Sequence, residues 1–155
     1  PYANFYFESY ETMKAQIQEM LYIEKGGDEQ LKDELAAYNP LIPKGKELVA
    51  TLMFEIDNPL SRAEFLNKVG GIEEKIFLKI GNDKIKSIPE QDVDRTSAEG
   101  KASSVQFIHF EFSDDQIKKF KDFSNEVIIG IDHEMYAHTS KLTESNKKSL
   151  ALDFD

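Results

Sequence analysis

The sequence predicts an α+β domain in which a ferredoxin-like sheet is built from two strand-helix-strand units, with an added N-terminal strand, a helical hairpin and a C-terminal helix. Two observations predict this fold. Apolar residues alternate along residues 47–56 and again along 104–112, which indicates two strands with one buried face each. Each strand runs directly into a helix-capping residue and an amphipathic helix, and a second apolar strand follows. A sheet with its helices mainly on one side is the economical packing of two such units.

The N-terminal part of the chain is predicted to form one strand and a helical hairpin. Aromatic residues favour a strand at residues 3–7, and Ser9 is suited to cap a helix that runs to about Lys25. A Gly-Gly pair ends this helix, and an Asn-Pro pair ends the next one.

The two strand-helix-strand units follow one pattern and are joined by a short hairpin. The first unit is expected to contain a strand at 47–56, a helix from Asn58 to Gly70 and a strand at 76–80. The second is expected to contain a strand at 104–112, a helix at 113–123 and a strand at 127–132. Between them, a short strand ends at Pro89, residues 90–101 form a surface loop, and a last helix begins near Thr143.

Length and composition favour one soluble domain over residues 1–155. The chain begins at Pro1, directly before the first strand, so we expect a native N-terminal segment to be missing. It contains no cysteine, which excludes disulfides and thiolate metal sites and fits a cytoplasmic location. No apolar run approaches the roughly 18 residues of a membrane span.

Charge and surface pattern indicate the kind of partner. The 29 acidic and 19 basic residues give a net charge of −10, which repels phosphate backbones and anionic lipid, so neither nucleic acid nor a membrane is an expected partner. Val49, Met53 and Phe77 lie on strand faces opposite the predicted core. Either the helical hairpin or another subunit must cover them, and we therefore expect a homodimer or a protein partner.

A metal site is the main chemical candidate in the sequence. There is no P-loop, no dinucleotide-binding glycine motif and no nucleophile elbow. All three histidines lie in or near the second unit, and His109, Glu111, His133 and His138 could converge on a metal with nitrogen and oxygen ligands. The alternative interpretation is that His109 is a half-buried strand residue and that the other two histidines lie on a solvated loop.

Several segments carry a resemblance to a known family. The blocks QIQEM at 16–20, ELAAYNPLIP at 34–43 and ELVATL at 47–52 are similar to the bacterial family called domain of unknown function 3501, and SVQF at 104–107 and GIDH at 130–133 resemble its later blocks. The resemblance implies a basic N-terminal segment and a gene neighbourhood of rubrerythrin-like and iron-sulfur proteins. It implies no activity, no cofactor and no site residues.

Two functions follow as hypotheses. The first is a non-enzymatic accessory module that binds a protein partner near redox or peroxide-stress chemistry, through the second sheet face or the first helix. The alternative is a metal-dependent redox or hydrolytic protein that uses the His/Glu site. The cofactor is unknown under either hypothesis.

Overall fold

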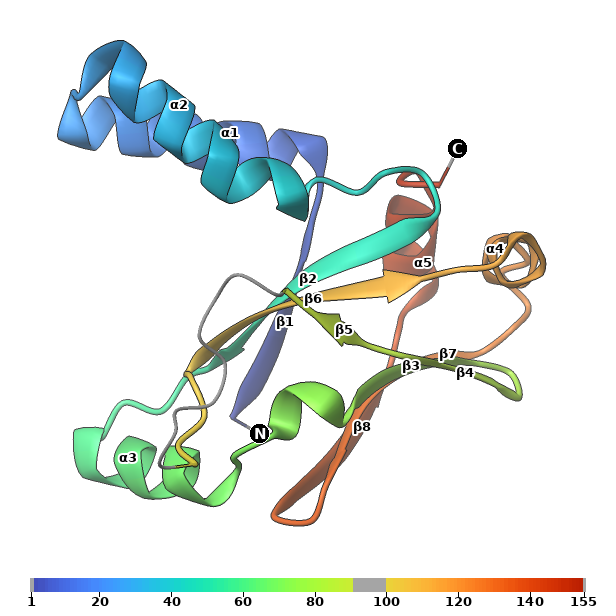
Figure 1. Cartoon of the computed structure of the whole chain (residues 1–155). Coiled ribbons are helices and arrows are strands. Elements are labelled where there is room, and N and C mark those ends of the chain that lie inside the picture. Colours follow the sequence, from blue (N-terminus) through green and yellow to red (C-terminus); the bar gives the residue numbers. More distant parts are fainter. Residues whose placement is uncertain (1, 91–99, 155) are drawn as a thin grey trace.

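The structure is a computed structural model that describes residues 2–90 and 100–154, and within them the chain forms two four-stranded antiparallel sheets and five α-helices (Figure 1). The first sheet has the order β1 (Ala3–Glu8), β2 (Glu47–Phe54), β6 (Val105–Glu111), β5 (Ile88–Pro89). The second has the order β4 (Asp83–Lys86), β3 (Ile76–Ile80), β7 (Val127–His133), β8 (Tyr136–Lys141). The helices are α1 (Tyr10–Glu24), α2 (Gly27–Tyr38), α3 (Pro59–Lys68), α4 (Asp114–Lys121) and α5 (Glu144–Ala151).

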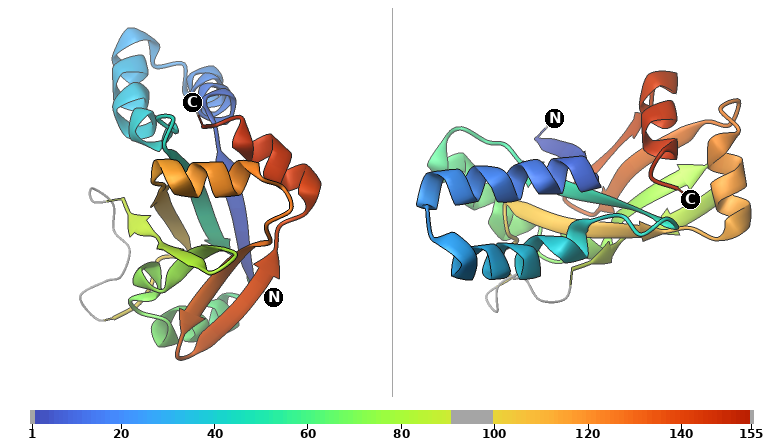
Figure 2. Two further views of the ribbon diagram at one scale, coloured as in Figure 1. Left: turned by 90° about the vertical axis from the view of Figure 1, so that its right-hand side faces the viewer. Right: turned by 90° about the horizontal axis from the view of Figure 1, so that it is seen from above.

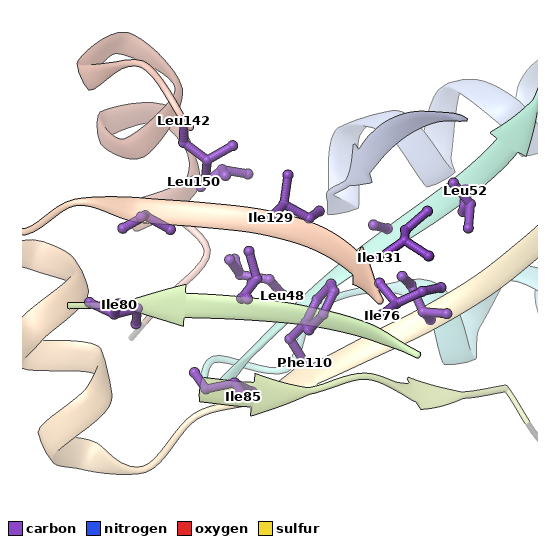
Figure 3. Packing of buried hydrophobic residues seen from close by; sticks show 14 of the residues in the cluster. Leu48, Leu52, Ile76, Ile80, Ile85, Phe110, Ile129, Ile131, Leu142 and Leu150 are labelled. Carbon is purple, nitrogen blue, oxygen red and sulfur yellow. The ribbon is translucent and has the colours of Figure 1, made fainter. Parts of the chain in front are cut away.

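The core lies between the inner faces of the two sheets (Figure 3). Strand alternation places one set of apolar side chains from each strand in this layer, and each such side chain contributes about 1.5–3 kcal/mol when fully buried. The buried residues from the central strands are Leu48, Ala50, Leu52, Phe54, Ile76, Leu78, Ile80, Ile108, Phe110, Val127, Ile129 and Ile131.

The ferredoxin-like arrangement is not confirmed, because each strand-helix-strand unit crosses from one sheet to the other. In the first unit, β2 belongs to the first sheet and β3 to the second, and in the second unit β6 and β7 are divided in the same way. The alternation of apolar residues identifies which face of a strand is buried, but it does not identify the neighbouring strand. The coarser prediction of a mixed α and β fold with the expected N-terminal strand, helical hairpin and C-terminal helix is confirmed.

A tyrosine joins the first strand to the second sheet at one end of the core. The hydroxyl of Tyr136, in β8, accepts hydrogen bonds from the backbone N–H groups of Tyr2 and Ala3, each at 3.2 Å. Its ring contacts Phe54 and Phe65 edge-on, with centroids 6.1 and 5.4 Å away. These contacts hold the start of β1 beside the start of β8, a strand that the sequence analysis did not predict.

The helical hairpin projects from the body of the molecule beside the first sheet (Figures 1 and 2). Helix α1 begins with a capping box between Ser9 and Thr12, and its buried residues are Met13 and Ile17. Helix α2 has no buried residue. The hairpin is therefore held mainly through one face of α1, and the second helix is attached to the first.

The hairpin covers part of the outer face of the first sheet, as one of the two predicted alternatives required. Met13 of α1 and Leu41 pack against Val49 of β2 in a small cluster that is separate from the main core. Met53 is only half-buried on the same face. Phe77 lies on the outer face of the second sheet, which the hairpin does not cover.

Candidate functional site

The outer face of the first sheet changes in character along its two central strands. Residues of β2 that face away from the core pair with outward-facing residues of β6 in the order Glu47 with Glu111, Val49 with His109, Thr51 with Phe107, and Met53 with Val105. One end of the face is therefore charged and the other is apolar. The helical hairpin covers the middle, where Val49 lies.

A half-open groove of about 670 Å³ lies between the hairpin and the apolar end of this face. Its residues come from β1, α1, β2 and β6, together with Tyr38 at the end of α2 and Leu41 just after it, so segments far apart in the sequence meet there. They are Phe5, Tyr6, Phe7, Glu8, Thr12, Met13, Gln16, Tyr38, Leu41, Thr51, Met53, Val105 and Phe107. Most of the lining is apolar, and a volume of this size is typical of ligand sites.

Glu8 holds the groove together at the junction of β1, β2 and α1. Its Oε1 accepts a hydrogen bond from the Thr51 hydroxyl at 2.8 Å, and its Oε2 accepts one from the Thr12 hydroxyl at 2.7 Å. Thr12 also belongs to the capping box at the start of α1. The carboxylate thus fixes the position of the helix relative to the sheet, with both of its oxygens engaged.

A second carboxylate stands on the exposed side of β1. Glu55 accepts hydrogen bonds from the Tyr6 hydroxyl at 2.8 Å and from the Asn4 amide at 2.9 Å. The hydrogen bond to Glu55 raises the pKa of Tyr6, and the negative charge of Glu55 acts in the same direction. Tyr6, at the edge of the groove, therefore donates its hydroxyl to Glu55.

His109 lies at the charged end of the face, between two carboxylates. Its Nδ1 is 3.1 Å from Glu47 Oε2 and its Nε2 is 2.8 Å from Glu90 Oε2, and the three side chains are 14, 12 and 20% exposed. Each ring nitrogen therefore faces a carboxylate oxygen from a different segment of the chain. Because the two nitrogens point in different directions, the ring and its two carboxylates cannot ligate a single ion together.

The structure does not bring the four predicted metal ligands together. His109 and Glu111 belong to the first sheet, whereas His133 and His138 belong to β7 and β8 of the second. Glu111 is exposed. Within residues 2–90 and 100–154, no group of three or more His, Cys, Asp or Glu side chains is placed to hold a metal ion.

The remaining two histidines have structural contacts of their own. The Nε2 of His133 donates to the Gly70 carbonyl at 3.1 Å, and its Nδ1 accepts from the Met135 backbone N–H at 3.0 Å. The ring of His138 lies 4.5 Å from the Tyr136 ring. Both residues lie on strands rather than on a solvated loop, so that part of the alternative interpretation is wrong, while the half-buried position of His109 is confirmed.

Sequence reasoning missed Glu8, Glu47 and Glu90, which carry the polar contacts of this face. Glu47 had a signal, because it shares the alternating strand face of Val49 and Thr51. Glu8 is the last residue of β1 and Glu90 follows β5, and both meet their partners only through the tertiary fold. The predicted surface loop at 90–101 falls, apart from Glu90 and the last two residues, outside the described part of the chain.

No helix in the described part of the chain is both long and apolar enough to cross a membrane. No match was found among curated proteins. One solved structure, a crystal structure of a "novel protein of unknown function" from Burkholderia pseudomallei, is 35% identical, with a TM-score of 0.91 over 100% of this chain and 81% of that chain. The model of the family "Protein of unknown function (DUF3501)" matches residues 1–154. The chain therefore belongs to the DUF3501 family.

Proposed function

We propose that the chain is a non-enzymatic accessory module that binds an apolar segment of a protein partner in the groove between the helical hairpin and the first sheet. The groove itself carries this proposal. It is half-open, so a segment of a larger molecule can enter it, and its volume of about 670 Å³ accommodates several side chains.

The chemistry of the lining supports binding rather than catalysis. Met53, Val105 and Phe107 are half-buried and present apolar surface. Met53 adds an unbranched thioether side chain that adapts to different partner shapes. The Glu8 carboxylate in this groove is engaged through both oxygens by threonine hydroxyls, which gives it a structural role. An apolar anchor would therefore supply most of the affinity.

The gene neighbourhood implied by the family resemblance supports a role for this binding near redox or peroxide-stress chemistry. Rubrerythrin-like and iron-sulfur proteins are therefore the first partners to test.

A photo-crosslinking experiment tests the proposal. A benzophenone amino acid is placed at Met53, in the groove, and separately at Leu60, which is 78% exposed at the start of α3. In cells that naturally produce the chain, illumination should give one defined protein adduct from position 53 and none from position 60. The absence of an adduct at position 53, or the same adducts from both positions, would contradict the proposal.

The second candidate is a metal-dependent redox or hydrolytic protein, and one observation favours it. Glu47 Oε1 is buried and has no hydrogen-bond partner within the described residues, although it lies beside the His109 ring. A buried carboxylate oxygen without a partner is unusual, and a cation would satisfy it. Elemental analysis of the purified protein decides between the two candidates.

A further inference from the structure

The outer face of the second sheet is basic, although the protein is strongly acidic. Side chains that point away from the core on β3, β4 and β8 include Lys79, Lys84, Lys86 and Lys141, all of them exposed, and Lys75 precedes β3 on the same side. The chain as a whole carries a net charge of −10. Five lysines on one uncovered sheet face therefore form a local field opposite in sign to the rest of the molecule.

Most of these lysines form no salt bridge within the described residues. Lys141 is 3.6 Å from Glu126, whereas Lys75, Lys79, Lys84 and Lys86 form no salt bridge there. Two acids do share the face: a depression of about 210 Å³ is lined by Lys75, Lys84 and Lys86 together with Ile76, Phe77, Glu74 and Asp132. Lysines still outnumber acids in this depression.

The centre of the lysine face is apolar. Phe77 is half-buried and lies against Gly130, where a side chain would leave no space: a Cβ atom there would be 2.5 Å from Phe77 Cζ. Lys84 Nζ lies 4.4 Å from the centre of the Phe77 ring. Ile128 of β7 is half-buried on the same side. Protein interfaces commonly have an apolar centre and a polar rim, and a rim of one charge sign favours a partner surface of the opposite sign.

The helical hairpin has the complementary composition. Residues 10–38 contain seven acidic and three basic residues, a net charge of −4. The hairpin also exposes large apolar side chains, since Tyr22 is 76% exposed and Ile23 62%, and Leu31 and Leu35 are 36 and 37% exposed. Because α2 has no buried residue, nothing in the described chain covers this acidic and apolar side.

We propose that the lysine face of one copy binds the helical hairpin of a second copy. Within one copy the two surfaces lie on opposite sides of the molecule, because the hairpin packs on the outer face of the first sheet and the lysine face is the outer face of the second. Only another copy can bring them together. Each contact joins two different surfaces, the lysine face of one copy and the hairpin of the other. When each of two copies binds the hairpin of the other with its lysine face, the two contacts close a dimer. The groove that carries the proposed function lies on the other side of the hairpin and does not take part.

Charge-exchange variants of the full chain test this contact by sedimentation and light scattering in 0.15 M salt. The face variant carries Lys79→Glu and Lys84→Glu, and the hairpin variant carries Glu19→Lys and Asp33→Lys. All four side chains are exposed, and circular dichroism checks that each variant folds. The wild-type chain should self-associate and each variant alone should do so at least tenfold more weakly, because like charges then face each other.

Mixing the two variants gives the decisive result. In a mixed pair, the acidic face of the face variant meets the basic hairpin of the hairpin variant, and the two unchanged surfaces meet each other. Opposite charges then face each other in both contacts, so association should return to the wild-type level. A control variant with Lys44→Glu and Lys68→Glu changes the net charge as much as the face variant does, but at positions away from the lysine face, and should associate normally. A monomeric wild type, association that both variants retain, or a mixture that stays monomeric would each overturn the proposal.

Discussion

Replacement of His109 by leucine should destabilise the protein strongly, because it removes the group between two carboxylates. The ring contacts Glu47 at 3.1 Å and Glu90 at 2.8 Å, and both carboxylates are 20% exposed or less. Leaving a buried hydrogen-bonding group without its partner costs about 1–3 kcal/mol, and more when that group is charged. Because loss of the ring leaves two carboxylates without their partner, we expect the upper end of this range, about 3 kcal/mol.

Urea denaturation and calorimetry measure this effect directly. For a chain of this size, 1 kcal/mol corresponds to about 2–4 °C, so His109→Leu should lower the melting temperature by roughly 6–12 °C. The matched control is His138→Leu, since His138 is exposed on β8 and its loss should change stability by less than about 0.5 kcal/mol.

A second set of variants separates the charge effect from the loss of packing. Adding Glu47→Gln and Glu90→Gln to His109→Leu removes both carboxylate charges, and this should recover at least about half of the lost stability. The reasoning is refuted if His109→Leu costs less than about 1 kcal/mol, or if neutralising the two carboxylates recovers nothing. In the latter case His109 would act through its shape alone.

Four further predictions concern stability, pH and metals. Lys147 is buried and donates to the carbonyls of residues 123 and 125 at 2.8 and 2.9 Å. Lys147→Ala should therefore lower the free energy of unfolding by about 3 kcal/mol in urea denaturation. The control Lys148→Ala removes an exposed ion pair and should lower it by less than about 1 kcal/mol. Gly130→Ala places a Cβ atom against the Phe77 ring and should cost about 1–3 kcal/mol by the same assay; an unchanged midpoint would contradict the close contact. Burial raises the pKa of Asp153 above 3.8, so the folded state binds the proton more tightly than the unfolded state does. The stability of the wild type relative to Asp153→Asn should therefore fall as the pH rises above 3.8. A stability difference that stays constant between pH 3 and 7 would contradict this prediction. Added iron, zinc or manganese should leave the melting temperature unchanged if the binding-module proposal is correct, whereas a rise would favour the metal-dependent candidate.

Most individual elements could be predicted from local sequence signals. Ser9, Asn58 and Ser113 are the caps of α1, α3 and α4, as expected from their side-chain chemistry. Strict alternation identified β2, which ends at Phe54, two residues before the predicted end. These features depend on neighbours within a few residues, so a single sequence contains the information for them.

The division into two sheets and the composition of the site could not be predicted in this way. The apolar alternation identifies one core-facing side of each strand, and the same alternation is compatible with one sheet or with two. Strand β8 was missed because five of its six residues are exposed and polar or small, so they show no apolar alternation. This strand is stabilised by its pairing with β7. The contacts of His109 with Glu47 and Glu90 join residues 62 and 19 positions apart, a separation at which sequence spacing carries no information.

The alternation of the chain between its two sheets has a consequence for folding. The first sheet takes its strands from residues 3–8, 47–54, 88–89 and 105–111, and the second from 76–80, 83–86, 127–133 and 136–141, so neither sheet is continuous in sequence. A single cut between residues 80 and 105 leaves neither fragment with a complete sheet. The two sheets must therefore form together, through contacts of high sequence separation, which predicts slow and all-or-none folding of the body. The α1–α2 hairpin, which is attached mainly through one face of α1, is the part that can open without disrupting either sheet.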